Sequence, residues 1–176
     1  MKPHASKGTL RFGLSILATA VLLCGCDDNR PNKQPAEIQS KAPLLDPNGN
    51  PWPAGAAYIQ NLPRLNNEGL SEITVDNRSN NSAVFVKMVE KSSGTHHAVR
   101  SFHIPQGGQF TLANVSPGIY EIRYMDLSSG QASKSEAFTI QERQTPTGIE
   151  YSTFTLTLYT VANGNMRMKP LSASEF

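Results

Sequence analysis

The chain of 176 residues is poor in cysteine, which limits what can hold its fold together. Its only cysteines, Cys24 and Cys26, lie two positions apart near the N-terminus. Small disulfide-stabilised domains carry many cysteines, and a structural zinc site normally uses four ligands. The two thiols therefore predict neither a disulfide scaffold nor, by themselves, a zinc centre. The fold must depend on a hydrophobic core.

An excess of basic charge is also missing. The chain has 16 Lys and Arg against 14 Asp and Glu, a net charge of +2. Three of the basic residues, Lys2, Lys7 and Arg11, lie in an N-terminal stretch without acidic residues. Without them, 13 basic and 14 acidic residues remain, a net charge of −1. A nucleic-acid-binding protein would show a concentrated basic face, so we expect no nucleic-acid partner.

No apolar run is long enough to cross a bilayer, which takes roughly 18–20 apolar residues. The apolar run in the first thirty residues, Phe12 to Leu23 (FGLSILATAVLL), has 12 residues. A basic flank followed by an apolar run of this length is typical of a secretory signal peptide. The alternative, a buried core helix, fits the basic flank and the terminal position less well. We therefore expect residues 1–25 to be a signal peptide.

The end of this run, Leu23-Cys24-Gly25-Cys26, resembles the lipobox of bacterial lipoproteins, which has Leu at −3 and Gly at −1 before the modified cysteine. The resemblance implies cleavage between Gly25 and Cys26, a diacylglycerol on the Cys26 thiol and acylation of the new amino group. Cys24 is the rival acceptor, but Leu23 directly before it is too large for the pattern. Two or three acyl chains hold a protein on a membrane far more firmly than one, at about 0.8 kcal/mol per buried methylene.

Asp27 and Asp28 follow the predicted acceptor. In enterobacterial lipoproteins an Asp at this place resembles the signal for retention in the inner membrane. The resemblance implies a lipid-anchored protein on the periplasmic face of the inner membrane of the bacterial envelope, with the outer membrane as the alternative.

Residues 26–69 form a predicted tether, since seven of the 12 prolines lie in this range. Proline removes a backbone donor and opposes both helix and central strand. The second half of the tether is unusually apolar for a spacer, because it contains the only tryptophan. We expect Trp52–Leu65 to dock on the following domain. Otherwise it is exposed or is a segment that a partner recognises, through Trp52, Tyr58, Leu62 and Leu65.

Residues 70–176 show short runs of alternating apolar and polar residues, separated by turn formers. This spacing predicts an all-β, antiparallel sandwich of about seven strands. The tail from Asn163 to Phe176 either folds back on the sheet or is an exposed strip. The expected strands are 71–75, 83–90, 97–104, 109–112, 119–125, 134–140 and 151–161.

The stretch Phe110–Tyr120 (FTLANVSPGIY) resembles the turn and strand of transthyretin-like and carboxypeptidase-regulatory-like sandwiches, in which a Pro-Gly turn precedes an aromatic residue. The wider region Trp52–Phe176 resembles a family of uncharacterised bacterial proteins. Both resemblances imply a fold and neither implies a chemistry.

No set of residues forms a recognisable catalytic pattern. The histidines His96, His97 and His103 are predicted to lie on the surface, and His97 and His103 are too far apart on one strand to bind one ion. Most carboxylates are predicted to be solvated. We expect no metal and no cofactor.

These observations favour a non-enzymatic, membrane-anchored sandwich that binds a protein or another envelope component. An accessory lipoprotein of a secretion apparatus and an envelope enzyme with an unrecognised site are the alternatives.

Overall fold

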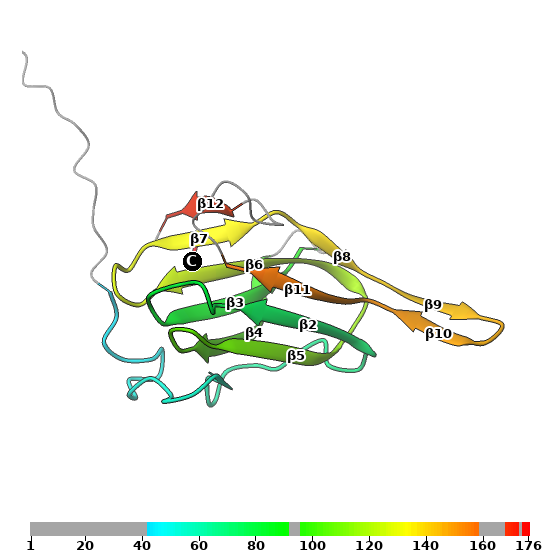
Figure 1. Cartoon of the computed structure of the whole chain (residues 1–176), viewed down its shortest axis with the longest axis horizontal. Coiled ribbons are helices and arrows are strands. Elements are labelled where there is room, and N and C mark those ends of the chain that lie inside the picture. The colour runs from blue at the N-terminus through cyan, green and yellow to red at the C-terminus, as the bar shows by residue number, and fades with distance from the viewer. Residues whose placement is uncertain (1–41, 92–95, 159–167, 173) are drawn as a thin grey trace, which may run out of the picture. The chain divides into compact units, whose positions relative to one another are not determined.

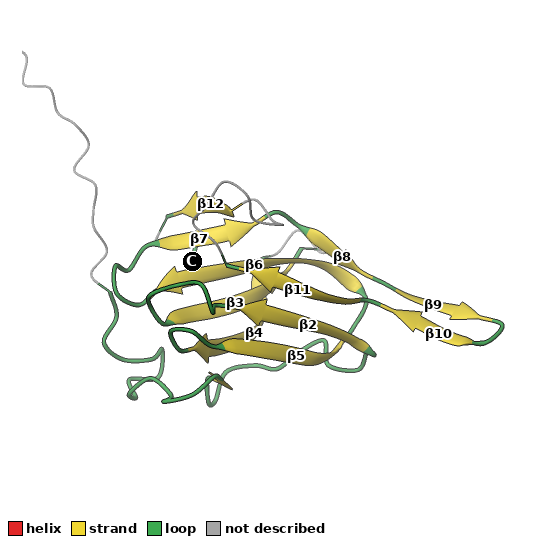
Figure 2. Cartoon of the chain, in the orientation of Figure 1, coloured by secondary structure: helices red, strands yellow, loops and turns green. Residues whose placement is uncertain are grey.

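The apolar and polar residues that alternate along the sequence form two β-sheets that pack face to face (Figure 1, Figure 2). The computed structural model describes residues 42–91, 96–158, 168–172 and 174–176, all within one compact unit, Glu37–Phe176. These described residues contain twelve strands and no helix. The all-β sandwich predicted from the sequence is confirmed.

The larger sheet contains seven strands, and every pair in it is antiparallel. The strands β1, β4, β3, β6, β7 and β12 lie side by side in this order, and β8 pairs with the first part of β6. Their bounds are Ala57–Tyr58 for β1, Val84–Glu90 for β3, His97–Ile104 for β4, Gly118–Asp126 for β6, Ala132–Ser135 for β7, Phe138–Ile140 for β8 and Met168–Leu171 for β12.

The smaller sheet has the order β11, β2, β5, with bounds Thr153–Thr157, Ser71–Asp76 and Gln109–Val115. β2 and β5 are antiparallel, but β11 runs parallel to β2. This pair departs from the purely antiparallel sandwich that we predicted. The chain passes from β8 in the larger sheet to β11 in the smaller one through a hairpin of β9 (Glu142–Thr145) and β10 (Gly148–Tyr151). It therefore enters β11 at the end where β2 begins.

All seven predicted runs contain strands. The run 134–140 overlaps two of them, β7 and β8, and residues 159–161 of the last run lie outside the described part. Two strands, β1 and β9, fall where none was predicted, and a third, β10, overlaps the last predicted run only at Tyr151. The fourth additional strand, β12, lies in the C-terminal tail and pairs with β7, as the fold-back prediction requires for these residues.

The core lies between the two sheets and is built from the inward side chains of each strand. Complete burial of a large apolar side chain stabilises the fold by roughly 1.5–3 kcal/mol, so a core of this size holds the sandwich without a disulfide. Its buried members are Ile73, Val75, Val84, Val86, Met88, Val99, Phe102, Ile104, Leu112, Val115, Tyr120, Ile122, Ile140, Leu156 and Leu158.

The turn between β5 and β6 is fixed by the side chain of Tyr120. The Tyr120 hydroxyl donates to the Ser116 carbonyl at 2.9 Å, four residues upstream, and accepts from Asn66 Nδ2 at 3.0 Å. This bond to the preceding corner resembles the tyrosine corner of other β-sandwiches. A Cβ on Gly118 would lie 3.0 Å from the Tyr120 ring, which explains the glycine beside the proline.

Gly69 lies against the backbone at the end of β5. A Cβ on Gly69 would lie 2.1 Å from the Val115 carbonyl oxygen, whereas a Cβ on Gly55 would meet no atom within 4 Å. We predict that Gly69→Ala lowers the free energy of unfolding by about 2 kcal/mol or more, because backbone must move to admit the methyl group. Gly55→Ala, the matched control, should change it by less than about 0.5 kcal/mol. Urea unfolding of both variants tests this, and equal midpoints would contradict the packing described.

Candidate functional site

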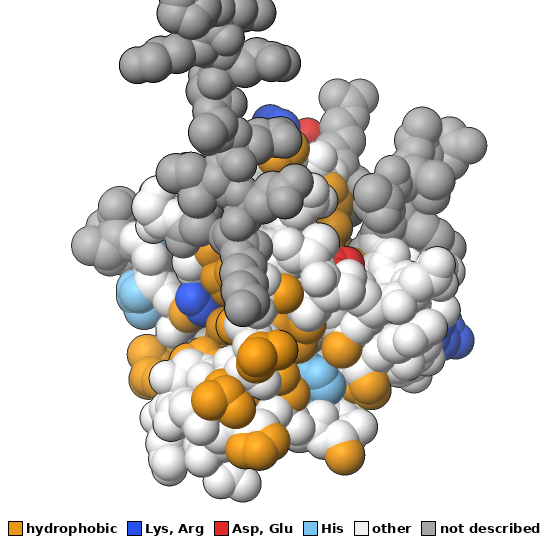
Figure 3. Space-filling view, turned by 90° about the vertical axis from the view of Figure 1, so that its left-hand side faces the viewer, with side chains coloured by type: hydrophobic (Ala, Val, Ile, Leu, Met, Phe, Trp, Pro, Cys, Tyr) orange, Lys and Arg blue, Asp and Glu red, His pale blue; other side chains and the backbone are white. Residues whose placement is uncertain are grey.

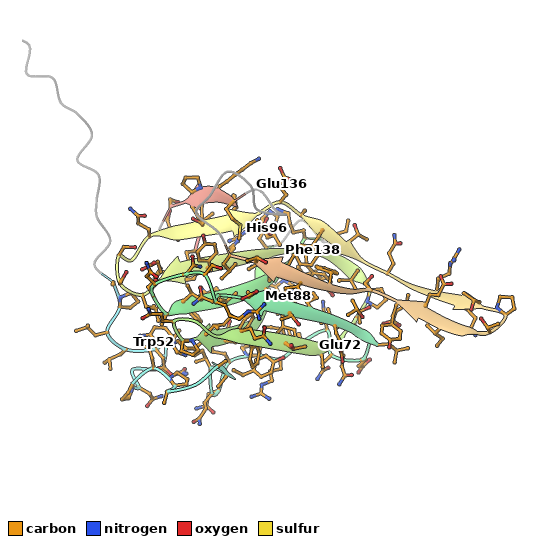
Figure 4. The ribbon with its side chains drawn as sticks, viewed as in Figure 1. Trp52, Glu72, Met88, His96, Glu136 and Phe138 are labelled. Carbon is orange, nitrogen blue, oxygen red and sulfur yellow. The ribbon has the colours of Figure 1, made fainter. Side chains whose placement is uncertain are left out.

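The described chain enters the sandwich at one end through a turn that covers the outer face of the larger sheet. Figure 3 looks onto this end and shows hydrophobic side chains gathered there. Trp52, labelled in Figure 4, stacks on the ring of His103 at 5.8 Å between centroids and contacts Phe85 at 5.3 Å. Its Nε1 donates to the Pro43 carbonyl at 3.1 Å. Trp52 therefore joins the entering chain to strands β3 and β4.

Tyr58 and Ile59 close the open side of the sandwich. β1 pairs with β4 through Ala57 and Tyr58, and the Tyr58 ring meets Phe102 and Phe110 edge-on, with centroids 6.3 and 5.0 Å away. Ile59 is buried, and its amide donates to the Ser101 carbonyl at 3.0 Å. The segment thus pairs with the edge of β4 and packs on aromatic residues from both sheets.

Arg100 holds the end of this segment in place. Its side chain is buried and points from β4 toward the smaller sheet. Its Nε donates to the Leu65 carbonyl and its Nη2 to the Asn66 carbonyl, each at 2.7 Å. Nη1 donates to the Tyr58 hydroxyl at 3.0 Å, and longer bonds of 3.4 Å reach carbonyls of β5. Carbonyl oxygens and one hydroxyl thus satisfy the guanidinium inside the protein.

The four side chains proposed from the sequence for partner binding therefore differ in their accessibility. Trp52 and Tyr58 are half-buried and engaged with the sandwich, and Leu62 is also half-buried. Leu65 is exposed, although its amide donates to the Val99 carbonyl. The segment is thus part of the domain, and of the four side chains only Leu65, at 45%, is exposed.

Arg100 supports a direct test of this arrangement. We predict that Arg100→Ala lowers the free energy of unfolding by about 3 kcal/mol, because the part-buried carbonyls of the segment and of β5 lose the guanidinium that donates to them. Arg64→Ala is the control: this exposed side chain only lies over the Tyr58 ring at 4.2 Å, an interaction of about 0.5–1 kcal/mol. Denaturant unfolding followed by Trp52 fluorescence measures both. A smaller loss for Arg100→Ala than for Arg64→Ala would contradict the role of Arg100.

A buried ionic cluster lies on the outer face of β6. Glu121 accepts from Lys91 at 2.9 Å and from Arg123 at 2.6 Å. Burial alone would raise the pKa of Glu121, but the hydrogen bonds from Lys91 and Arg123 outweigh it and lower the pKa. The prediction that carboxylates are solvated is wrong for Glu121. It is also wrong for Asp76, which is buried beside Arg78 at 2.7 Å.

The C-terminal residues cover this cluster. Arg123 donates to the Glu175 carbonyl, and Lys87 Nζ donates to a Phe176 oxygen at 2.6 Å. The Phe176 ring lies 5.5 Å from Phe85, the same ring that Trp52 contacts. Burial lowers the pKa of Lys87, and the positive charge of Arg123 lowers it further. The cluster is thus closed by structural contacts rather than open to a substrate.

The histidines do not form a metal site. His96 and His97 are exposed, and His97 Nε2 lies 3.9 Å from Glu90 Oε2. The surface prediction is wrong for His103, which is buried under Trp52 and bonded through Nδ1 to the Gly55 carbonyl at 3.1 Å. Burial lowers the pKa of His103 more than this bond raises it. Among the described residues, no three His, Cys, Asp or Glu side chains are close enough together to hold a metal ion.

A polar hollow of about 280 Å³ lies between the β2–β3 and β6–β7 loops and is lined by Ser79, Asn80, Asn81, Ser82, Asp126 and Ser128. Burial would raise the pKa of Asp126. Hydrogen bonds from the hydroxyls of Ser128 and Ser82 and from the amides of Ser129 and Ser128 lower it to about 2. Both carboxylate oxygens of Asp126 therefore accept hydrogen bonds that hold the two loops together, which gives the hollow a structural role.

The most exposed ordered element is the β9–β10 hairpin, which we call the arm. It projects from the end of the sandwich opposite to the entry of the described chain (Figure 1). Ile149 and Tyr151 lie two positions apart on β10 and share one face, with exposed fractions of 47% and 52%. The other face carries the exposed pair Arg143 and Glu150, bonded at 2.7 Å. An isolated two-stranded hairpin is marginally stable at best.

The base of the arm is fixed to the smaller sheet. Gln141 and Ser152 exchange hydrogen bonds, and Ser152 also bonds to Ser71 and Glu72 of β2. The Leu70 amide donates to Glu142 Oε1 at 2.6 Å. The arm is therefore held at its root by polar bonds, while its apolar face remains in water.

The sequence analysis missed the arm because residues 141–150 lie between two predicted strands. The available signal was the sequence Thr145-Pro146-Thr147-Gly148, which forms the turn between the two short strands of the arm. The predicted lipidation and sorting residues, Gly25, Cys26, Asp27 and Asp28, lie outside the described residues.

Comparison with protein-family models, curated proteins and solved structures finds no match for this chain. Within the described part of the chain, no helix has the length and apolarity that crossing a membrane requires.

Proposed function

We propose that this chain is a membrane-anchored lipoprotein of the bacterial envelope, a non-enzymatic β-sandwich that binds a protein partner through the arm. The anchor rests on the sequence Leu23-Cys24-Gly25-Cys26 after a basic and apolar leader. Acyl chains on Cys26 hold the N-terminal side at the membrane, with Asp27 and Asp28 favouring the periplasmic face of the inner membrane. The outer membrane is the alternative location.

The observation that carries the binding proposal is the pair of apolar side chains on one face of the arm, beside Gln144 and Glu142 of β9. Ile149 and Tyr151 are about half exposed on an ordered hairpin that adds no apolar burial to the core cluster. Exposed apolar side chains on a protruding element are typical of interaction sites. The arm lies at the far end of the sandwich from the segment that leads to the anchor (Figure 1), which favours a protein rather than the anchoring bilayer as its partner.

The buried charged groups support a non-enzymatic role. Arg100 is bonded to carbonyls of the entering segment, Glu121 to Lys91 and Arg123, and Asp126 to the loops beside it. Each of these groups has a structural partner and contributes to holding the chain together. His96 and His97 are exposed, and His103 is covered by Trp52.

Lipidation gives the first test. In a bacterial host fed labelled palmitate, we predict that the wild-type chain and Cys24→Ser incorporate the label, while Cys26→Ser does not and leaves the membrane fraction. Cys24→Ser is the matched control because it removes the neighbouring thiol within the signal. Label in Cys26→Ser, or none in the wild type, would contradict the anchor.

The arm gives the second test. A photo-crosslinking residue at position 151 should capture a defined protein in intact cells, and one at the exposed position Gln106 should not. Ile149→Ser with Tyr151→Ser should reduce binding of that protein about tenfold or more, since each apolar side chain contributes roughly 1.5–3 kcal/mol when fully buried.

The opposite face of the same hairpin supplies the control. Arg143→Ser with Glu150→Ser removes an exposed ion pair, which contributes little, and should leave capture unchanged. Equal loss from both double variants would show that the apolar face has no specific role. Retained capture by Ile149→Ser with Tyr151→Ser would remove the arm from the proposal.

A further inference from the structure

A second exposed apolar surface lies at the entry end of the sandwich, on the turn that contains Leu44 and Leu45. Their exposed fractions are 79% and 49%. The turn is ordered by its own bonds: Leu45 and Pro51 form a bridge, and Asp46 Oδ1 accepts from the amides of Asn48 and Asn50 at 2.9 and 2.8 Å. These bonds hold the turn together while both leucines project into water.

The sequence around the two leucines is almost free of charge. Residues 42–56 contain one ionisable side chain, Asp46, which is buried and bonded to the turn itself. Trp52 lies beside the turn, and its indole N–H bonds to the carbonyl of Pro43, directly before Leu44. Because the carboxylate of Asp46 already bonds to the turn, no exposed charged group of residues 42–56 has to be dehydrated when the turn enters an apolar or interfacial environment. Aromatic residues such as Trp52 are enriched at membrane–water interfaces.

The short stretch of chain between Cys26 and the turn favours the bilayer as the surface that covers the two leucines. Fifteen residues, 27–41, separate Cys26 from Ala42. A flexible chain of this length has an end-to-end distance of about 20 Å and cannot exceed roughly 50 Å. If the acyl chains on Cys26 lie in a bilayer, the turn is confined close to that bilayer's surface, where its effective concentration is high.

We infer that the Leu44–Leu45 turn is a membrane-contact surface, which inserts its two leucines into the interfacial region of the bilayer that holds the acyl chains. The inference rests on the proposed lipid anchor and deepens it. Contact at this end orients the sandwich, so that the arm at the opposite end points away from the membrane (Figure 1).

The single tryptophan of the chain makes this contact measurable. Full-length mature protein, purified from membranes, is reconstituted into vesicles of phosphatidylethanolamine and phosphatidylglycerol with a fraction of lipids brominated near the headgroup. We predict that bromine quenches Trp52 fluorescence. Leu44→Ser with Leu45→Ser should lose most of this quenching, and the single variant Leu44→Ser should lose part of it.

Leu70→Ser with Ile149→Ser is the matched control. These two residues are 45% and 47% exposed and lie at the root and on the face of the arm, so quenching should be unchanged. An unchanged urea midpoint shows that each variant is folded.

Three outcomes overturn the inference. In the first, the wild-type protein carries acyl chains but Trp52 is not quenched, which leaves the proposed anchor intact. In the second, quenching persists in the Leu44 and Leu45 double variant. In the third, sedimentation shows a dimer that this variant dissociates while Trp52 remains unquenched, which assigns the turn to a second copy.

The proposed lipid anchor can be tested independently of the membrane-contact surface. Palmitate labelling that finds no acyl chain would remove the proposed function. Leucine-dependent quenching of the unacylated protein at high lipid concentration would still support the membrane-contact surface.

Discussion

The larger sheet is buried on both faces, and this constraint organises the rest of the structure. On β3, Val84, Val86 and Met88 face the smaller sheet, while Phe85 on the outer face is also buried. One sheet can cover only one face of another. The outer face is instead covered by the two ends of the described chain, since Trp52 and Phe176 both contact Phe85. The described part of the predicted tether, from Ala42 onward, is therefore part of the sandwich rather than a spacer before it.

The polar interior follows from the same constraint. Covering the outer face of β6 encloses Glu121 and Arg123, which need partners once water is removed. Glu121 and Arg123 bond to each other. Glu121 also bonds to Lys91, and Arg123 donates to a backbone carbonyl of the C-terminal tail. Arg100 similarly satisfies carbonyls where the entering segment crosses the open side of the sandwich. These charges fix where the two chain ends lie, and through them the relation between the entry turn and the arm.

The strands could be predicted from the sequence because their side chains alternate. Runs such as Thr153–Thr157, with Phe154 and Leu156 between threonines, have one apolar face and one hydroxylated face whatever lies beside them. The burial of Glu121 and His103 could not be predicted. It depends on Trp52, which stacks on His103, and on the Glu175 carbonyl, which accepts from Arg123 beside Glu121. Both are distant in sequence and reach these side chains only in the folded chain.

The arm and the parallel pair escaped prediction for related reasons. β9 (ERQT) contains no apolar residue, and the alternation in β10 (GIEY) is only four residues long, so neither strand of the hairpin has a run long enough to predict it. The direction of β11 depends on the path through that hairpin, which no local pattern encodes. The apolar character of Trp52–Leu65, in contrast, was visible in the composition, and the structure shows its origin in the Trp52 stack and the β1–β4 pair.

The parallel pairing of β11 with β2 also affects when the domain can form. Phe154 lies opposite Ile73, 81 residues earlier in the chain, and Leu156 and Leu158 complete the same core. A polypeptide exported from its N-terminus presents β2 long before β11 emerges. During that interval β2 lacks this neighbour and the core lacks three of its apolar side chains, Phe154 among those packed at its border. Pairings of such long sequence separation form slowly. For the exported lipoprotein that we propose, this means that the domain matures only after translocation is nearly complete, and that the emerging chain until then presents an unfinished sheet to chaperones and proteases.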